Sequence, residues 1–268
     1  MKCASLRFET LALRAEGAVL SVRLNRPAVR NAFNGTLVRE LSAAFAAIDG
    51  DDDVRVVVLS GEGKSFSAGA DLAWMTEQAG LPRESNQAGA VEMATMFLRI
   101  AHCAKPVVAR VFGHALGGGC GLTAAADCAI CTDDTVFGLT EVKLGIVPAV
   151  ISPFVMQKLG AGRARTLFLT GERFDGKEAE RIGLVHRSVP AAALDGEVTR
   201  VVDELRSSGP AAVASAKRLI RAVDGLALDD AIPVTSRWIA ELRATPEARE
   251  GMAAFLDKRT PNWNSGPS

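Results

Sequence analysis

Two glycine-containing turns hold the residues best suited to chemistry. The first, KSFSAGADL, spans residues 64–72, and the second, GHALGGGCG, spans residues 113–121. Each follows an apolar run typical of a buried strand and leads to an expected helix start, where free N–H groups favour negative charge. Small residues let a ligand approach the backbone closely. Tight helix–strand packing would explain either turn alone, but the pair predicts two N–H groups that stabilise an enolate oxygen.

Other motif-like segments are better explained by packing. Residues 63–65 (GKS) look like the end of a phosphate-binding loop, but Val58 stands where that motif requires glycine. Cys128 and Cys131 have the spacing of a metal or redox pair, yet on a strand their side chains would face opposite sides. The three histidines show no ligand spacing. We therefore expect no metal, and no nicotinamide or flavin cofactor.

The composition limits the class of protein. The chain has 268 residues, 48% of them hydrophobic, which fits one large domain or a domain with an appendage. Lysine plus arginine (31) balances aspartate plus glutamate (31), so no overall attraction to nucleic acid or to a membrane surface is expected. Arg7, Glu9 and Arg14 interrupt any signal peptide, and no apolar stretch is long enough to span a membrane. Five scattered cysteines indicate reduced thiols in a cytoplasmic protein.

The elements that must position the two turns alternate between strands and helices. Strands are predicted from short apolar or alternating runs at 17–24, 54–59, 106–112 and 128–132. Helices are predicted over residues 84–102 and after Asn34, a suitable N-cap that precedes a stripe of apolar residues: Leu37, Leu41, Phe45 and Ile48. This alternation argues for an α/β fold.

The C-terminal part reads differently, as a series of helices. The predicted helices span 191–208, 210–223, 228–244 and 246–258. Pro210 and Pro246 suit the first helical position, and Thr245 suits a cap. We expect a core over residues 1–195 and a helical region over 196–268 that packs on another subunit, because its apolar surface exceeds what one short arm can hide.

The ordered motifs of the chain resemble the enoyl-CoA hydratase/isomerase (crotonase) family over nearly its whole length. The matching segments are NRPAVRNAF (25–33), KSFSAGADL (64–72), GHALGGGCGL (113–122), FGLTEVKLGIVP (137–148), TGERFDGKEAERIGLV (170–185) and EGMAAFLDKR (250–259). The resemblance implies a ClpP-like spiral of ββα units, a C-terminal helical trimerisation region, and homotrimers or dimers of trimers. Its substrate would be an acyl-CoA thioester, with no separate cofactor.

The resemblance also implies roles for individual residues. By motif position, Ala70 and Gly118 supply the two oxyanion N–H groups. CoA would lie along the segment from Lys64 to Leu72, which includes Ala68 and Asp71. Phe255 and Lys258 match a C-terminal pair that approaches the CoA of a neighbouring subunit, where Lys258 would meet phosphate. Trp74, with Met75 and Gln78, would line the acyl pocket or belong to the core.

The family's hydratases use two glutamates, and this chain has one of them. Glu141 matches one position, and Gly121 stands at the other, where it would border the substrate. The segments SAGADLAWM and EVKLGIVPAVISPF, together with Gly121, resemble bacterial methylglutaconyl-CoA hydratases of leucine degradation. A hydratase for a short or branched 2-enoyl-CoA is therefore expected. A Δ3,Δ2-enoyl-CoA isomerase, in which one base moves one proton, and a non-catalytic acyl-CoA-binding member remain alternatives.

Overall fold

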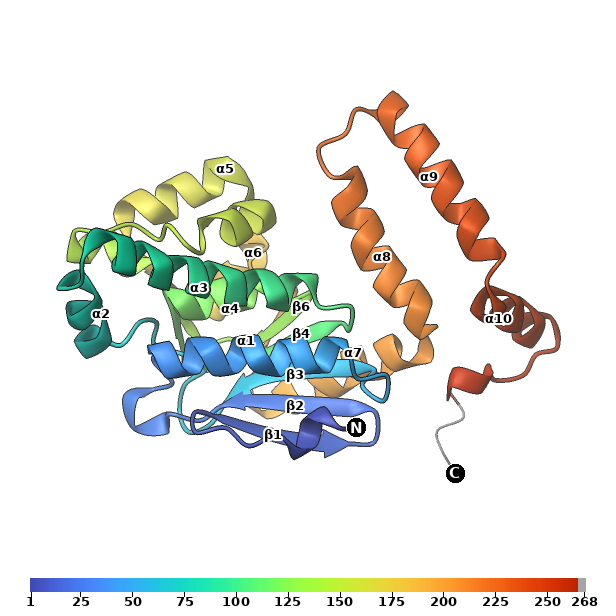
Figure 1. Ribbon diagram of the computed structural model, residues 1–268, viewed down its shortest axis with the longest axis horizontal. Helices are drawn as coiled ribbons and strands as arrows, with labels where there is room; N and C mark the ends of the chain where they lie inside the picture. Colours follow the sequence, from blue (N-terminus) through green and yellow to red (C-terminus); the bar gives the residue numbers. More distant parts are fainter. Residues whose placement is uncertain (265–268) are drawn as a thin grey trace.

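A computed structural model describes residues 1–264, and its strands form two sheets (Figure 1). The large sheet has the order β1-β2-β3-β4-β6-β9 and is parallel except for the antiparallel β1–β2 pair. Its strands are β1 (Leu11–Glu16), β2 (Val19–Leu24), β3 (Val56–Gly61), β4 (Val107–Val111), β6 (Cys128–Thr132) and β9 (Arg187–Val189). The small sheet has the order β5-β7-β8, with strands β5 (His114–Leu116), β7 (Val136–Gly138) and β8 (Arg173–Phe174).

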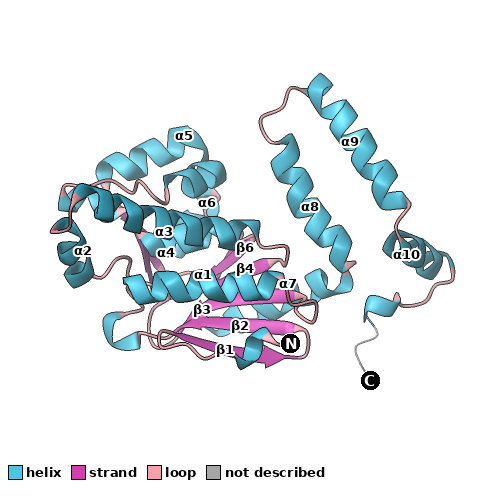
Figure 2. Ribbon diagram, viewed as in Figure 1, coloured by secondary structure: helices cyan, strands magenta, loops and turns pink. Residues whose placement is uncertain are grey.

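Helices cover both faces of the large sheet (Figures 1 and 2). One face carries α1 (Gly35–Asp49) and α3 (Arg83–His102), and the other carries α7 (Leu194–Ser207). Alternate residues of β3 point to opposite faces, so Val57 belongs to the core under α1, whereas Val56 packs in the cluster under α7. Burial on both faces explains why this strand is almost entirely apolar.

The chain alternates between the two sheets as it advances. β4 joins the large sheet and β5 the small one, and α4 (Gly118–Ala125) follows. β6 and β7 repeat this pattern before α5 (Ser152–Thr170), and α6 (Gly176–Ile182) then connects β8 to β9. The result is the α/β spiral of ββα units that the resemblance implied. Short 3-10 turns complete the path: η1 (Cys3–Ser5), η2 (Pro27–Val29), η3 (Thr140–Leu144), η4 (Ala191–Ala193) and η5 (Asn262–Asn264).

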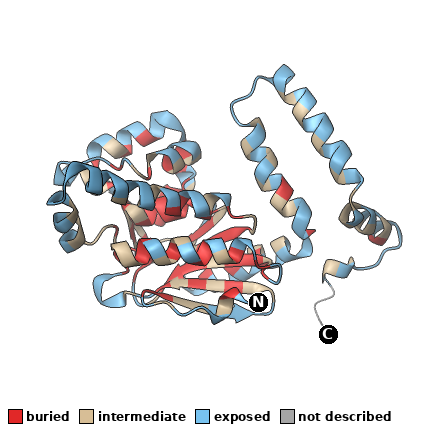
Figure 3. Cartoon of the chain, viewed as in Figure 1, coloured by how far each residue is buried: buried red, intermediate tan, exposed pale blue. Residues whose placement is uncertain are grey.

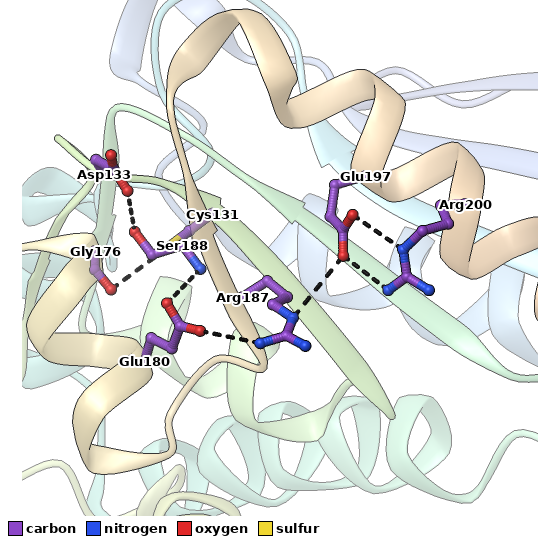
Figure 4. Close-up of polar contacts among 8 residues, drawn as sticks. All are labelled: Cys131, Asp133, Gly176, Glu180, Arg187, Ser188, Glu197 and Arg200. Atoms are coloured by element: carbon purple, nitrogen blue, oxygen red, sulfur yellow. Dashed lines mark hydrogen bonds and ion pairs between the residues drawn. The ribbon is translucent and has the colours of Figure 1, made fainter.

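A polar cluster fixes β9 between α6 and α7 (Figure 4). The backbone N–H of Ser188 donates to Glu180 at 3.0 Å, and its hydroxyl donates to Asp133 at 2.7 Å. Arg187 reaches Glu180 at 3.6 Å and Glu197 at 4.0 Å, one on each helix. Both helices are thereby tied to the edge strand of the large sheet.

The last three helices stand apart from the sheets (Figure 1). They are α8 (Pro210–Val223), α9 (Leu228–Arg243) and α10 (Pro246–Leu256), and most of their residues are exposed (Figure 3). Lys217 of α8 is tied to the core by a 2.6 Å ion pair with Asp127. As expected, Pro210 and Pro246 open their helices, and Thr245 caps α10 by accepting the N–H of Ala248 at 3.2 Å.

Several other local expectations are confirmed. Asn34 caps α1 by accepting the N–H of Leu37 at 2.9 Å. The strand expected at 128–132 is β6, with Cys131 in the main core and Cys128 packed against the α7 cluster on the opposite face. The division at residues 195 and 196 stays a prediction. It falls at the start of α7, which packs on β3, β4 and β6, so by its contacts α7 sits with the core. None of the helices within residues 1–264 has the length and apolar character of a membrane span.

Candidate active site

The two glycine-containing turns lie side by side and are joined through their backbones. The N–H of Ser67 donates to the carbonyl of His114 at 2.9 Å, and the N–H of Leu116 donates back to Ser67 at 3.0 Å. At Gly69, where φ is +90°, a Cβ atom would lie 2.9 Å from the carbonyl oxygen of Leu116. Glycine at this position therefore permits both the left-handed backbone and the close approach of the second turn.

The amides of Ala70 and Gly118, here called the oxyanion pair, are left free by this arrangement. Phe33 bonds to the neighbours of Ala70, donating to Gly69 at 2.7 Å and accepting from Asp71 at 2.9 Å, which turns the N–H of Ala70 to the other side. Gly118 is the first residue of α4, where backbone N–H groups lack helical acceptors. Within residues 1–264 neither amide donates to a protein acceptor, and both residues line one cavity.

The carboxyl group of Glu141 lies close to the oxyanion pair. Its Oε1 atom is 3.0 Å from the position that a Cβ would take on Gly117, the residue before Gly118. Its Oε2 atom is buried and has no hydrogen-bond partner among the described residues. Burial raises the pKa of Glu141 above the ordinary value of 4.5, since desolvation disfavours the charged form. A carboxylate with these properties suits a general base.

The cavity that joins these groups has a volume of about 890 Å³. The two turns form one wall, and side chains of α2 (Leu72–Ala79), α3 and the segment 140–151 form the others. Most of the side chains that line the cavity are apolar, among them Phe33, Leu72, Trp74, Met75, Met93, Val147, Pro148 and Ile151. The size and apolar lining are typical of a small-molecule site.

Gly121 lies one helical turn beyond Gly118, in a different environment. A Cβ atom at Gly121 would collide with Cγ2 of Ile151 and lie 2.9 Å from the ring of Phe97. The residue is buried and does not line the cavity. Apolar side chains therefore fill the place where the family's second glutamate would begin, and Glu141 is the one acidic residue on the cavity wall within residues 1–264.

Comparisons with known proteins agree with this geometry. The family model for enoyl-CoA hydratase/isomerase matches residues 14–266. A relative from Thermus thermophilus, described as a putative enoyl-CoA hydratase, is 35% identical, with 92% of this chain and 98% of the relative covered. A crotonyl-CoA hydratase from Syntrophomonas wolfei is 34% identical, with 97% and 100% covered. The crystal structure of an enoyl-CoA hydratase from Shewanella pealeana is similar with a TM-score of 0.92 at 35% identity, over 96% of this chain and 97% of the other.

The chain belongs to the enoyl-CoA hydratase/isomerase family. The crotonase fold expected from the sequence is confirmed. Of the residues that the family resemblance assigned, the structure brings a subset to one cavity: Ala68, Ala70, Leu72, Trp74, Gly118 and Glu141. Their individual roles stay predictions, but their shared location is what the proposed chemistry requires.

Other assigned residues lie outside this cavity. Asp71 caps α2 by accepting the N–H of Ala73 at 3.1 Å, and it pairs with Arg26 at 3.2 Å. Lys64 is an exposed residue of the first turn, away from the acyl cavity. Phe255, 84% exposed, belongs to α10, which stands on the side of the molecule opposite to α2 (Figure 1), and Lys258 follows that helix.

Several residues that line the cavity were not among those predicted from the sequence. Phe33, Met93, Thr140, Lys143 and Arg173 all line the cavity. Phe33, Thr140, Lys143 and Arg173 fall within segments that match the family, so a signal was present, although nothing in their types marked them as functional. Met93 lies on α3 in a helical pattern, which gave no signal beyond that of a core residue.

Proposed function

We propose that this enoyl-CoA hydratase adds water to a short or branched 2-enoyl-CoA of the 3-methylglutaconyl-CoA kind, in leucine degradation. The observation that carries the proposal is the position of the Glu141 carboxyl beside the free amides of Ala70 and Gly118 in one largely apolar cavity. The resemblance to methylglutaconyl-CoA hydratases and the names of the relatives support hydration. The cytoplasm is the proposed location.

In the proposed mechanism, the thioester oxygen accepts hydrogen bonds from the oxyanion pair. Glu141 takes a proton from water as the water oxygen bonds to C3, and the C2–C3 double bond shifts its electrons toward the thioester. The enolate oxygen that forms is stabilised by the two N–H groups. Glu141 then returns the proton to C2, so one carboxylate serves both steps. A glutaconyl substrate brings its own carboxylate, which would help to orient the water. In this proposal CoA is part of the substrate, and no metal or separate cofactor takes part.

The proposal places CoA at the edge of the first turn and a neighbouring subunit at the C-terminal helices. CoA would run along the segment from Lys64 to Leu72, and Phe255 and Lys258 would approach the CoA of an adjacent copy in a trimer or a dimer of trimers. The apolar side chains exposed on α9 and α10 support such packing: Leu228, Ile232, Ile239, Met252, Phe255 and Leu256. If sedimentation finds a monomer at micromolar concentration, this part of the proposal fails.

A double-bond isomerase is the second candidate, and one observation favours it. Glu141 is the single acidic residue lining the described cavity, and the space at Gly121 is closed by Ile151 and Phe97. An isomerase needs only one base that moves a proton along the substrate. Hydration, by contrast, adds a water molecule that must also be held.

A substrate panel tests the proposal. Wild-type protein is incubated with crotonyl-CoA, 3-methylglutaconyl-CoA and a 3-enoyl-CoA, and the absorbance of the conjugated enoyl thioester is followed. Hydration lowers this absorbance with 2-enoyl substrates, whereas isomerisation of the 3-enoyl substrate raises it. We expect loss with both 2-enoyl substrates and a higher kcat/KM for 3-methylglutaconyl-CoA. A strong preference for crotonyl-CoA would contradict the substrate assignment, and a gain with the 3-enoyl substrate alone would favour the isomerase.

A further inference from the structure

Two cations line the same cavity as the oxyanion pair. Within residues 1–264, the charged residues of the cavity wall are Glu141, Lys143 and Arg173. Neither cation takes part in any of the ion pairs found among these residues. The other lining side chains are apolar or neutral, so the two cations are the features that would distinguish one acyl group from another by charge.

The packing of their side-chain stems places the two cations at neighbouring points of the wall. A Cβ on Gly171 would lie 3.4 Å from both Cγ and Cε of Lys143, so the Lys143 stem runs across the turn that leads into β8. Arg173 lies two residues further on, in β8 itself. Its Cγ is 3.2 Å from the position of a Cβ on Gly138, a site that Thr140 also borders at 3.1 Å.

Short segments of backbone connect Lys143 and Arg173 to Glu141 and to the oxyanion pair. The carbonyl of Gly138 accepts the N–H of Gly117 at 2.8 Å, and Gly117 precedes the oxyanion residue Gly118. Lys143 follows Glu141 by two residues on the same 3-10 turn. The stems of both cations are therefore fixed on the part of the wall next to Glu141 and the oxyanion pair, where the acyl group of a bound thioester would lie.

We propose that Lys143 and Arg173 form a receptor for a carboxylate at the far end of the acyl group, and so select dicarboxylic acyl-CoA substrates. The inference rests on the proposed function, and it assigns that function's substrate preference to two residues. Arginine offers a planar donor pair that matches a carboxylate, and lysine adds a mobile point charge. Both residues are exposed and their stems lie on the wall, so a bound carboxylate would meet the two cations without a change of fold.

Substitution of each cation by glutamine tests the receptor. Arg173→Gln and Lys143→Gln are compared with wild type on 3-methylglutaconyl-CoA and on crotonyl-CoA, which lacks the second carboxylate. For the dicarboxylic substrate we expect kcat/KM to fall about 10- to 100-fold with Arg173→Gln and less with Lys143→Gln. For crotonyl-CoA we expect a change below about threefold, because no charged partner is lost. Arg165→Gln, on an exposed residue of α5 outside the cavity, is the matched control.

Binding measurements separate failure of the receptor from failure of the proposed function. Calorimetry with glutaryl-CoA, butyryl-CoA and free CoA needs no turnover, so it applies even if wild type hydrates none of the enoyl substrates. The proposal expects Arg173→Gln to weaken glutaryl-CoA selectively. An equal loss for all three ligands would show that the cation binds a CoA phosphate and would overturn it. Unchanged glutaryl-CoA binding, or a change of oligomeric state in the variant, would also overturn it.

Discussion

Two positions one helical turn apart in α4 place the same residue type in opposite environments. At the N-terminal end, Gly117 and Gly118 border the cavity, and the free Gly118 amide and the Glu141 carboxyl lie there. One turn later, Gly121 is enclosed by Ile151 and Phe97. Glycine at the N-terminus of α4, here called the open end, keeps space free for a ligand, whereas Gly121, here called the closed position, lets the core side chains meet.

This difference shows that the second carboxylate of family hydratases is not simply missing. The side chains of Ile151 and Phe97 occupy the space that the Cβ of a glutamate at position 121 would need. A glutamate could not be restored there unless these side chains of α3 and of the segment before α5 moved. The groups that carry out the reaction must then lie at the open end, where the Gly118 amide and the Glu141 carboxyl are found. We therefore expect substitutions at the open end to change activity, and substitutions at the closed position to change stability.

The largest effect is expected from Glu141→Gln. Glutamine keeps the shape of the side chain but cannot accept a proton, so kcat should fall about 10²- to 10⁴-fold, the usual contribution of a general base. Initial rates with crotonyl-CoA and 3-methylglutaconyl-CoA measure the loss, and circular dichroism checks that the fold is unchanged. Retention of hydration within a few-fold would remove Glu141 from the mechanism.

Gly121→Ala is expected to lower stability rather than activity per folded molecule. The new methyl group would overlap Ile151 and press on the Phe97 ring, and overpacking of this kind costs about 3 kcal/mol in the free energy of unfolding. Urea unfolding followed by fluorescence gives the value.

Gly162→Ala supplies the matched control for that measurement. Gly162 lies in α5, and no heavy atom lies within 4 Å of the position that a methyl group would take there, so alanine should raise stability by about 0.5 to 1 kcal/mol through its better helix propensity. If both alanine variants were equally stable, the interpretation of Gly121 as a closed position would be wrong.

Much of the fold could be predicted from the sequence because its signals are local. Asn34, Pro210 and Thr245 mark helix ends by their own chemistry, and the apolar run at 54–59 marks a strand buried on both faces. The oxyanion residues were identified from motif position, and the structure adds the reason their amides are free.

Gly121 was assigned to the substrate site because its motif position borders substrate in relatives. Its enclosure depends on Ile151 and Phe97, which come from distant parts of the chain, and no local pattern reports such a contact. The position of Arg173 beside the cavity depends on the pairing of β8 with β7, so it could not be predicted from the local sequence either.

Gly117→Ala should show an intermediate effect, on both stability and activity. Gly117 has φ of +48° and ψ of −111°, a conformation that alanine adopts only with strain of about 2 kcal/mol. Its methyl group would also lie 3.0 Å from Oε1 of Glu141 and displace the base. We therefore expect lower kcat together with a lower urea midpoint, in contrast to the pure stability effect of Gly121→Ala. Wild-type kcat in this variant would contradict the placement of Glu141.

The smallest expected effect is on stability, and it concerns how the free energy of unfolding changes with pH in wild type and in Glu141→Gln. Burial raises the pKa of this carboxyl in the folded state above its ordinary value of 4.5, so the folded protein holds the proton that the unfolded chain releases. As pH rises from about 4.5 through the raised folded pKa, ionisation of this one group lowers the free energy of unfolding, and the loss persists at higher pH. Glutamine does not ionise, so Glu141→Gln should match wild type near the bottom of this window and be more stable than wild type above it. Urea unfolding of both proteins across the window measures the difference. A variant that is less stable than wild type above the window would show that the carboxylate stabilises the fold, and that the open end of α4 is not held at a cost to stability.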